Sequence, residues 1–246
     1  MSLVFAQDTI IPNRAFKRVN FRQLKRKFFE INVELKRKGV SFSVFNNNLP
    51  NYKYFYFPLH VDPEASTMVL AHMHTDQISV IEAISKSLPG DSILVVKEHL
   101  PMVGRRPTGF YQTLRKIPRV VLITPHFDSL ELVKNSEAVI TITGTASFEA
   151  ILLKKKTIII GDHPILGIEE GFIYEPSLAN LPKAIAQLKH FQYASEDATV
   201  RYLAAIFQCA FQMDTLILWG SYRDYPQEKK VDTVKAISSR LLKAIG

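Results

Sequence analysis

Residues 138–150 have the sequence Ala-Val-Ile-Thr-Ile-Thr-Gly-Thr-Ala-Ser-Phe-Glu-Ala, and this stretch decides the fold. Its first half is an apolar run, typical of a strand that is buried on both faces of a sheet. Gly144 follows the strand, and residues 147–153 have the apolar spacing of a short helix. A buried strand, a glycine turn and a helix in direct succession form the unit from which parallel α/β sheets are built.

The same alternation extends in both directions from this stretch. Strands of this apolar kind, with helices between them, predict a parallel sheet covered on both faces, with right-handed crossovers. We therefore predict an α/β fold, a Rossmann-like doubly wound parallel sheet over residues 52–190. The predicted strands are 54–59, 92–97, 120–124, 138–142 and 157–160, and the predicted helices are 77–88, 108–117, 129–135 and 147–153.

Helical extensions are predicted on both sides of this domain. Residues 1–51 contain a predicted helix at about 20–38, with an apolar seam, followed by a loop. Residues 191–246 are predicted to form a C-terminal helical extension that packs on the domain and ends in an amphipathic helix over 231–245. The seam of the first helix consists of Phe21, Leu24, Phe28, Ile31 and Leu35.

The composition excludes several classes of protein. With 47% hydrophobic and 22% charged residues, the chain is neither disordered nor a coiled coil. No run of 18 apolar residues predicts a transmembrane helix, and the N-terminus lacks the apolar core and cleavage site of a secretory signal. The single cysteine, Cys209, is expected in the core, and it fits a reduced, cytoplasmic setting.

The net charge of +8 is concentrated near the N-terminus. Three interpretations of the basic helix remain open: a solvated face, attachment to a partner domain, or peripheral contact with anionic lipid at the inner membrane. No nucleic-acid-binding module is recognised, so nucleic acid is not an expected partner. The basic residues are Arg14, Lys17, Arg18, Arg22, Lys25, Arg26, Lys27, Lys36, Arg37 and Lys38.

Polar side chains follow the predicted strands at the points where the strands end. In an open α/β sheet, ligands bind outside the carboxyl ends of the strands. Thr143, Gly144 and Thr145 stand between a buried strand and a helix, where glycine permits close approach of a ligand and helix-terminal amides attract an anion. These residues are therefore predicted to bind a phosphate of a nucleotide sugar, and Glu149, one turn further, could accept hydrogen bonds from ribose hydroxyls.

A second interpretation of the same turn assigns it no ligand. Thr145 or Ser147 would cap the helix, and Glu149 would complete a capping box. Spacing alone does not separate the two interpretations.

Other strand ends carry further candidates. Lys97 and His99 could meet the donor phosphate, or they could form a solvated strand end. His60 with Glu64 could act as an acid/base pair, or they could form a hydrogen bond within a loop. The remaining histidines of the domain and the tail share no metal-ligand spacing, so no metal is expected. They are His72, His74, His126, His163 and His190.

Four of these strings carry a resemblance to a known family. Residues 57–67 (Phe-Pro-Leu-His-Val-Asp-Pro-Glu-Ala-Ser-Thr), 96–99 (Val-Lys-Glu-His), 140–150 and 157–161 resemble capsule polysaccharide biosynthesis proteins. That group includes the β-Kdo transferases of capsule assembly. The resemblance covers roughly residues 52–175 and implies the donor-binding, C-terminal-type half of the GT-B fold, in which two Rossmann-like domains face each other across a cleft.

The resemblance also implies roles for individual residues. Lys97 and His99 would contact the donor phosphate, and His60 and Glu64 would line the cleft near the transferred sugar, as the candidate catalytic residues. Residues of the glycine turn would hold the phosphate or the nucleotide, and a following carboxylate would hold the ribose. These donor-binding residues are Thr143, Gly144, Thr145, Ser147 and Glu149.

The sequence departs from the family pattern in two respects. Leu100 stands between His99 and Pro101, where the family has His-Pro directly. Only about 50 residues precede the predicted domain, whereas a GT-B enzyme has an acceptor domain of comparable size. We therefore expect the chain to be a fragment of a longer protein, a truncated homologue, or a chain that works with a partner subunit.

Three functional hypotheses follow. The first is a metal-independent glycosyltransferase half that takes a sugar from a CMP- or UDP-linked donor, without a cofactor, and passes it to a growing surface or capsular glycan. The second is a sugar-nucleotide epimerase or hydrolase on the same scaffold. The third is a non-catalytic subunit that binds nucleotide sugars during assembly.

Overall fold

The structure is a computed structural model that describes residues 39, 42–209, 231–232 and 234–239. The helix predicted at residues 20–38 and the side chain of Cys209 lie outside the described part. Of the predicted final helix, residues 231–232 and 234–239 are helical.

The described residues form a six-stranded sheet in which every pair of neighbouring strands is parallel. The strand order is β3-β2-β1-β4-β5-β6, which is a doubly wound order and confirms the predicted Rossmann-like fold. The short edge strand β6 was not predicted, because a strand of two residues shows no periodicity. The strands are β1 Lys53–Pro58, β2 Ser92–Lys97, β3 Val120–Ile123, β4 Ala138–Thr141, β5 Lys156–Ile159 and β6 Ile173–Tyr174.

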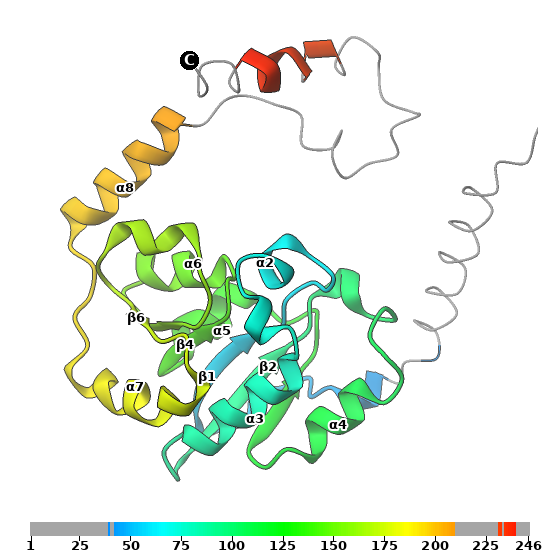
Figure 1. The fold of residues 1–246 in the computed structure, drawn as a ribbon. Helices are drawn as coiled ribbons and strands as arrows, with labels where there is room; N and C mark the ends of the chain where they lie inside the picture. The colour runs from blue at the N-terminus through cyan, green and yellow to red at the C-terminus, as the bar shows by residue number, and fades with distance from the viewer. Residues whose placement is uncertain (1–38, 40–41, 210–230, 233, 240–246) are drawn as a thin grey trace, which may run out of the picture.

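Helices cover both faces of the sheet (Figure 1). On one face, α3, α4 and α7 pack against Phe55 and Phe57 of β1. On the other face, α5 and α6 pack against Tyr54 and Tyr56, because successive side chains of a strand point to opposite faces. The α-helices are α2 Ala65–Met68, α3 Gln77–Ser87, α4 Phe110–Lys116, α5 Ser129–Asn135, α6 Ala146–Leu152, α7 Leu181–Gln187 and α8 Glu196–Cys209.

Side-chain caps fix where two of these helices begin. The carboxylate of Asp76 accepts hydrogen bonds from the amides of Ile78 and Ser79 at the start of α3. The carboxylate of Asp128 accepts one from the amide of Glu131 at the start of α5. Both aspartates satisfy amides that have no partner within the helix.

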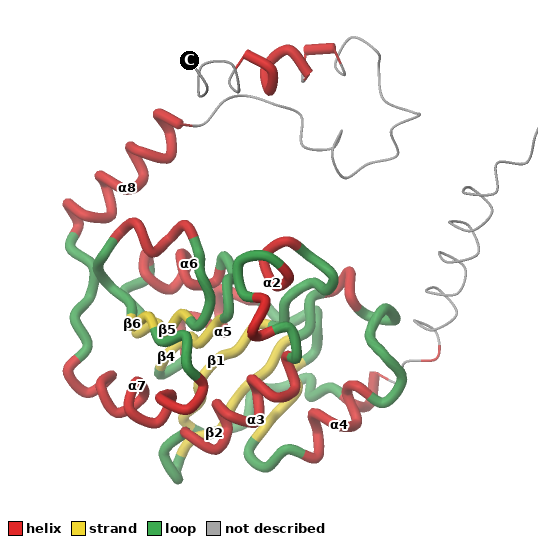
Figure 2. Tube along the Cα trace, in the orientation of Figure 1, coloured by secondary structure: helices red, strands yellow, loops and turns green. Residues whose placement is uncertain are grey.

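Segments on either side of the sheet pack against it. Phe45 is buried in the core, and Asn46 pairs with Ile123 at the edge of β3. At the other end, Ala194 and Ala198 are buried against β5 and the 3-10 helix Pro164–Ile168. The second half of α8 extends away from the domain (Figure 2), and Phe207 is exposed there.

The strand order places a crevice at one point of the sheet. β1 and β4 are neighbours, and the chain proceeds from them to opposite edges of the sheet. In such sheets the connections diverge at this switch point and leave a crevice outside the carboxyl ends of the two strands. The residues that follow β1 and β4 are therefore the first place to look for a ligand site.

Candidate functional site

A cavity of about 690 Å³ lies at the carboxyl ends of the strands, over the switch point. Its volume is within the usual range for small-molecule sites. Of the nine residues predicted to form the site, all except Ser147 line this cavity. They are His60, Glu64, Lys97, His99, Thr143, Gly144, Thr145 and Glu149.

The turn after β4 is held by hydrogen bonds to residues beneath it. The amide of Thr143 donates to Nε2 of His60 at 3.0 Å, and the Thr143 hydroxyl donates to the carbonyl of Ser66 at 2.9 Å. The amide of Gly144 donates to Oγ1 of Thr141 at 3.0 Å. The amides of Thr143 and Gly144 and the hydroxyl of Thr143 therefore already have partners within the protein, and these two residues form part of the cavity wall. Of the three residues of the turn, Thr145 is the exposed one.

Helix capping does not explain this turn. Thr145 occupies the N-cap position of α6, but its side chain makes no capping hydrogen bond. Ser147 is fully buried, and its hydroxyl donates to the carbonyl of Gly144 at 2.8 Å. The capping box of the second interpretation is therefore absent, and Ser147 supports the turn from behind without reaching the cavity.

His60 is a buried, neutral histidine. Burial and, secondly, the positive charge of Arg106 lower the pKa of its imidazole from 6.5 to about 4. Because Nε2 accepts the Thr143 amide, the neutral ring carries its hydrogen on Nδ1. No contact joins His60 to Glu64 among the described hydrogen bonds; Glu64 instead accepts from the hydroxyl of Ser66 at 2.8 Å.

This histidine makes the stability of the domain depend on pH. Between pH 6.5 and 4 the unfolded chain binds a proton at residue 60 that the folded protein does not, so the free energy of unfolding falls as the pH falls through this window. A shift of this size corresponds to roughly 3 kcal/mol at pH 4. We expect chemical denaturation to show this loss in the wild type and a shallower one in His60→Gln, whose amide oxygen accepts the Thr143 amide without titrating. Equal pH slopes for the two proteins would contradict it.

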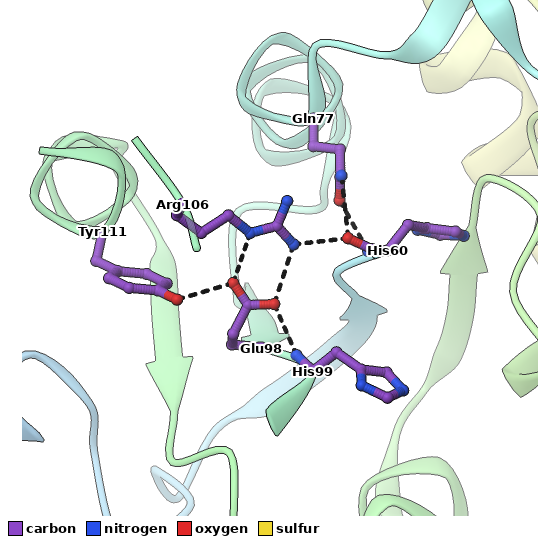
Figure 3. Close-up of polar contacts among 6 residues, drawn as sticks. All are labelled: His60, Gln77, Glu98, His99, Arg106 and Tyr111. Carbon is purple, nitrogen blue, oxygen red and sulfur yellow. Dashed lines mark hydrogen bonds and ion pairs between the residues drawn. The ribbon is translucent and has the colours of Figure 1, made fainter. Parts of the chain in front are cut away.

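A buried ion pair links the residues that follow β1 and β2 (Figure 3). Arg106 donates to Glu98 through Nε at 2.7 Å and through Nη2 at 3.0 Å, and the two side chains are almost fully buried. Nη2 of Arg106 also donates to the carbonyl of His60 at 2.6 Å. The Glu98 carboxylate accepts two further hydrogen bonds, from the amide of His99 at 2.7 Å and from the hydroxyl of Tyr111 at 3.0 Å.

The backbone of His60 is held from a second side. Gln77, at the start of α3, accepts from the His60 amide at 2.8 Å and donates to its carbonyl at 3.2 Å. The positions of His60 and His99 therefore depend on one connected set of buried polar groups (Figure 3). Neither Arg106 nor Gln77 was predicted from the sequence to be part of the site.

Lys97 and Glu149 place opposite charges in the cavity. Nζ of Lys97 donates to the hydroxyl of Ser129 at 2.6 Å. Burial lowers the pKa of Lys97, while Asp128 and Glu149 raise it. Burial raises the pKa of Glu149, while the charge of Lys97 lowers it. Each group is half-buried and costs free energy to keep charged, so a ligand that pairs with either of them is favoured.

Leu100, the residue that departs from the family pattern, also lines the cavity. It begins the 3-10 helix Leu100–Met102 and is 46% exposed. His99 precedes it, is exposed, and lines the cavity as well. The extra residue therefore adds an apolar side chain to the wall beside His99.

The described residues contain neither a metal-binding cluster nor a membrane-spanning helix. No cluster of three or more His, Cys, Asp or Glu side chains there could hold a metal ion. No helix in that part of the chain has the length and apolar character needed to cross a bilayer.

The chain matches a known protein family. The family described as capsule polysaccharide biosynthesis proteins matches residues 34–208, well over half of the 246 residues. This span contains the whole sheet and every residue that lines the cavity. A search of curated proteins gives no match.

Similar solved structures include two epimerases and a transferase. A putative UDP-N-acetylglucosamine 2-epimerase from Listeria monocytogenes is 19% identical, with a TM-score of 0.42, over 63% of this chain and 44% of its own. KpsC from Thermosulfurimonas dismutans, a beta Kdo 2,7 transferase, is 16% identical, with a TM-score of 0.41, over 75% and 65%. The UDP-GlcNAc 2-epimerase of Methanocaldococcus jannaschii is 20% identical, with a TM-score of 0.44, over 77% and 52%. The chain thus spans 44% to 65% of the length of these structures.

Proposed function

Because the chain belongs to the capsule polysaccharide biosynthesis protein family, we propose that it forms the nucleotide-sugar-binding half of a glycosyltransferase that builds a surface polysaccharide. One observation carries the proposal. A cavity of about 690 Å³ at the switch point of a doubly wound sheet brings together a half-buried lysine, a half-buried carboxylate and the start of α6. This is the set of groups that a phosphorylated, hydroxyl-rich ligand needs.

The nucleotide-sugar donor would be bound by a cation, by neutral hydrogen-bond donors and by a carboxylate. Lys97 would pair with a phosphate oxygen and stabilise the negative charge that develops on the phosphate when the sugar departs. Thr145 and the amide of Ala146, the first residue of α6, would donate to the same group, because the next amides of the helix already donate to the carbonyls of Gly144 and Thr145. Glu149 would accept hydrogen bonds from ribose hydroxyls. These hydroxyls are neutral, so they do not compete with the phosphate for Lys97. His99, exposed beside Lys97, would be a further phosphate contact.

For His60 we propose a positioning role in place of acid/base catalysis. A general base has to accept a proton from the substrate, but Nε2 of His60 is occupied by the Thr143 amide and its pKa is about 4. Its role would be to set the turn that shapes the cavity wall. Glu64 would remain beside the transferred sugar, and the group that activates the acceptor would lie on a second domain facing this one.

Binding of free nucleotides to the purified chain is the direct test. We expect calorimetry with CMP, UDP, GDP and ADP, without added metal, to show selective binding of a pyrimidine nucleotide. Incubation with the matching nucleotide sugar, with and without a glycan acceptor, then separates transfer from the alternatives. Release of an epimer or of free sugar would favour the epimerase or hydrolase, and binding of no nucleotide would refute the proposal.

The role of Lys97 gives a specific prediction. Replacing Lys97 by methionine removes the cation while keeping most of its apolar stem, and we expect nucleotide affinity to fall about 10-fold. The matched control is Lys53→Met, because Lys53 begins β1 at the opposite end of the sheet and pairs there with Asp91. Calorimetry should show a lower nucleotide affinity for Lys97→Met and an unchanged one for Lys53→Met. Equal affinities in the two variants would mean that Lys97 does not bind the nucleotide.

A further inference from the structure

His163 lines the cavity at its far side from Lys97, and no hypothesis from the sequence assigned it a role. It follows β5, whereas Lys97 ends β2, and the strand order places β1 and β4 between them. Three strand spacings of about 4.8 Å separate the backbones of β2 and β5 by about 14 Å. The two side chains therefore address different parts of any extended ligand in the cavity.

The position of His163 is fixed by its neighbours in the chain. The amide of Asp162 donates to the carbonyl of Leu70 at 3.0 Å, and its carboxylate accepts from the hydroxyl of Tyr174 at 2.5 Å. A side chain on Gly161 would come within 2.6 Å of Ala71 and 2.8 Å of Thr143, so glycine allows this loop to lie against the turn after β4. The strand end that carries His163 is thus held against the cavity wall.

The hydrogen-bond pattern sets the tautomer of His163. Its Nδ1 accepts from the amide of Ile165 at 3.0 Å and so caps the 3-10 helix Pro164–Ile168. A neutral imidazole that accepts at Nδ1 carries its hydrogen on Nε2, where it is a donor. Burial lowers the pKa of His163, which favours this neutral form. Among the described residues no acceptor is found for Nε2.

We propose that His163 binds the ligand through its Nε2–H, as a neutral donor to an uncharged oxygen, a carbonyl or a hydroxyl, at the end of the cavity opposite Lys97. This deepens the proposed function and rests on it. Lys97 would hold the charged phosphate, and His163 would hold a part of the nucleotide sugar that carries no charge. The side chain would then contribute to selection among donors. A bound ligand would displace water from Nε2–H, and a ligand without the matching acceptor would leave this donor without a partner.

Two substitutions separate the cap from the ligand contact. In His163→Asn, the amide oxygen occupies the place of Nδ1 and can still accept from Ile165, but nothing reaches the place of Nε2. In His163→Gln, the longer side chain can place an amide donor near the position of Nε2 while the cap is lost. A role confined to folding predicts that only the second variant changes the protein.

We expect His163→Asn to have the melting temperature of the wild type and to bind the preferred nucleotide sugar about 10-fold more weakly. His163→Gln should melt a few degrees lower, as loss of a cap does in a domain of this size, and should bind more tightly than His163→Asn. The probes are CMP and UDP and their sugar conjugates, measured by calorimetry on the full chain. Nitrogen-15 spectra of the histidine rings should show the hydrogen of His163 on Nε2.

Two different failures can be told apart. If the wild type binds none of the nucleotides or nucleotide sugars, the proposed function and the ligand role of His163 are both overturned. If the wild type binds and His163→Asn binds equally well, only the inference about His163 fails. A ring hydrogen on Nδ1 in the free protein also overturns it.

Discussion

Replacing Arg106 by leucine is expected to lower the free energy of unfolding by about 3–5 kcal/mol, the usual cost of leaving a buried charge without its partner. Arg106 is 6% exposed and Glu98 is 1% exposed, so the carboxylate left behind would have little access to water. The carbonyl of His60 would lose its 2.6 Å donor at the same time. Chemical denaturation of the variant measures the effect, with Arg115→Leu, an exposed arginine on α4, as the matched control.

An apolar replacement of the whole cluster distinguishes stability from positioning. In a triple variant with Glu98→Leu, Arg106→Leu and Tyr111→Phe, no buried charge or hydroxyl is left without a partner, and most of the lost stability should return. Nucleotide affinity should not return, because the His60 carbonyl would still lack its arginine donor and the His99 amide its carboxylate acceptor. Full recovery of binding in the triple variant would show that the ion pair has no positioning role.

The architecture could be predicted from the sequence because it depends on hydrophobic periodicity. The apolar runs that predicted strands at 92–97 and 138–142 correspond to β2 and β4, and the helix predicted at 129–135 is α5. Periodicity reports which face of an element is buried, and in a parallel sheet that is enough to give the layers. The strand order itself was not predicted, although the observed order is of the doubly wound kind.

The cavity wall could be predicted for a related reason, but its support could not. Residues such as His60, Lys97 and Thr143 follow strands, and the carboxyl ends of parallel strands meet at one edge. Arg106 follows no strand, and nothing in the sequence distinguishes it from its neighbour Arg105, which is exposed. Only the folded chain shows that one arginine turns inward to meet Glu98, because that contact depends on how the loop after β2 closes over the strand end.

The turn after β4 leads to the second large prediction. Replacing Gly144 by alanine is expected to weaken nucleotide binding by about 100-fold or more, because a misplaced cavity wall affects every contact that it sets. A Cβ atom at this position would lie 2.7 Å from Oγ1 of Thr141 and 3.3 Å from Nε2 of His60. These two atoms accept the amides that hold the turn, so the strain falls directly on the hydrogen bonds that shape it. Overpacking of this kind also costs about 1–3 kcal/mol of stability.

The matched control for this substitution is Gly90→Ala, because a Cβ atom on Gly90 would meet nothing within 4 Å. It should leave both affinity and stability close to those of the wild type. Adding Thr141→Ala to Gly144→Ala removes the atom at 2.7 Å and should relieve the clash, but it also removes the acceptor of the residue 144 amide. We therefore expect the double variant to regain more of the lost stability than of the lost nucleotide affinity. Wild-type affinity in Gly144→Ala itself would mean that the ligand does not depend on this turn, and the donor would have to bind elsewhere.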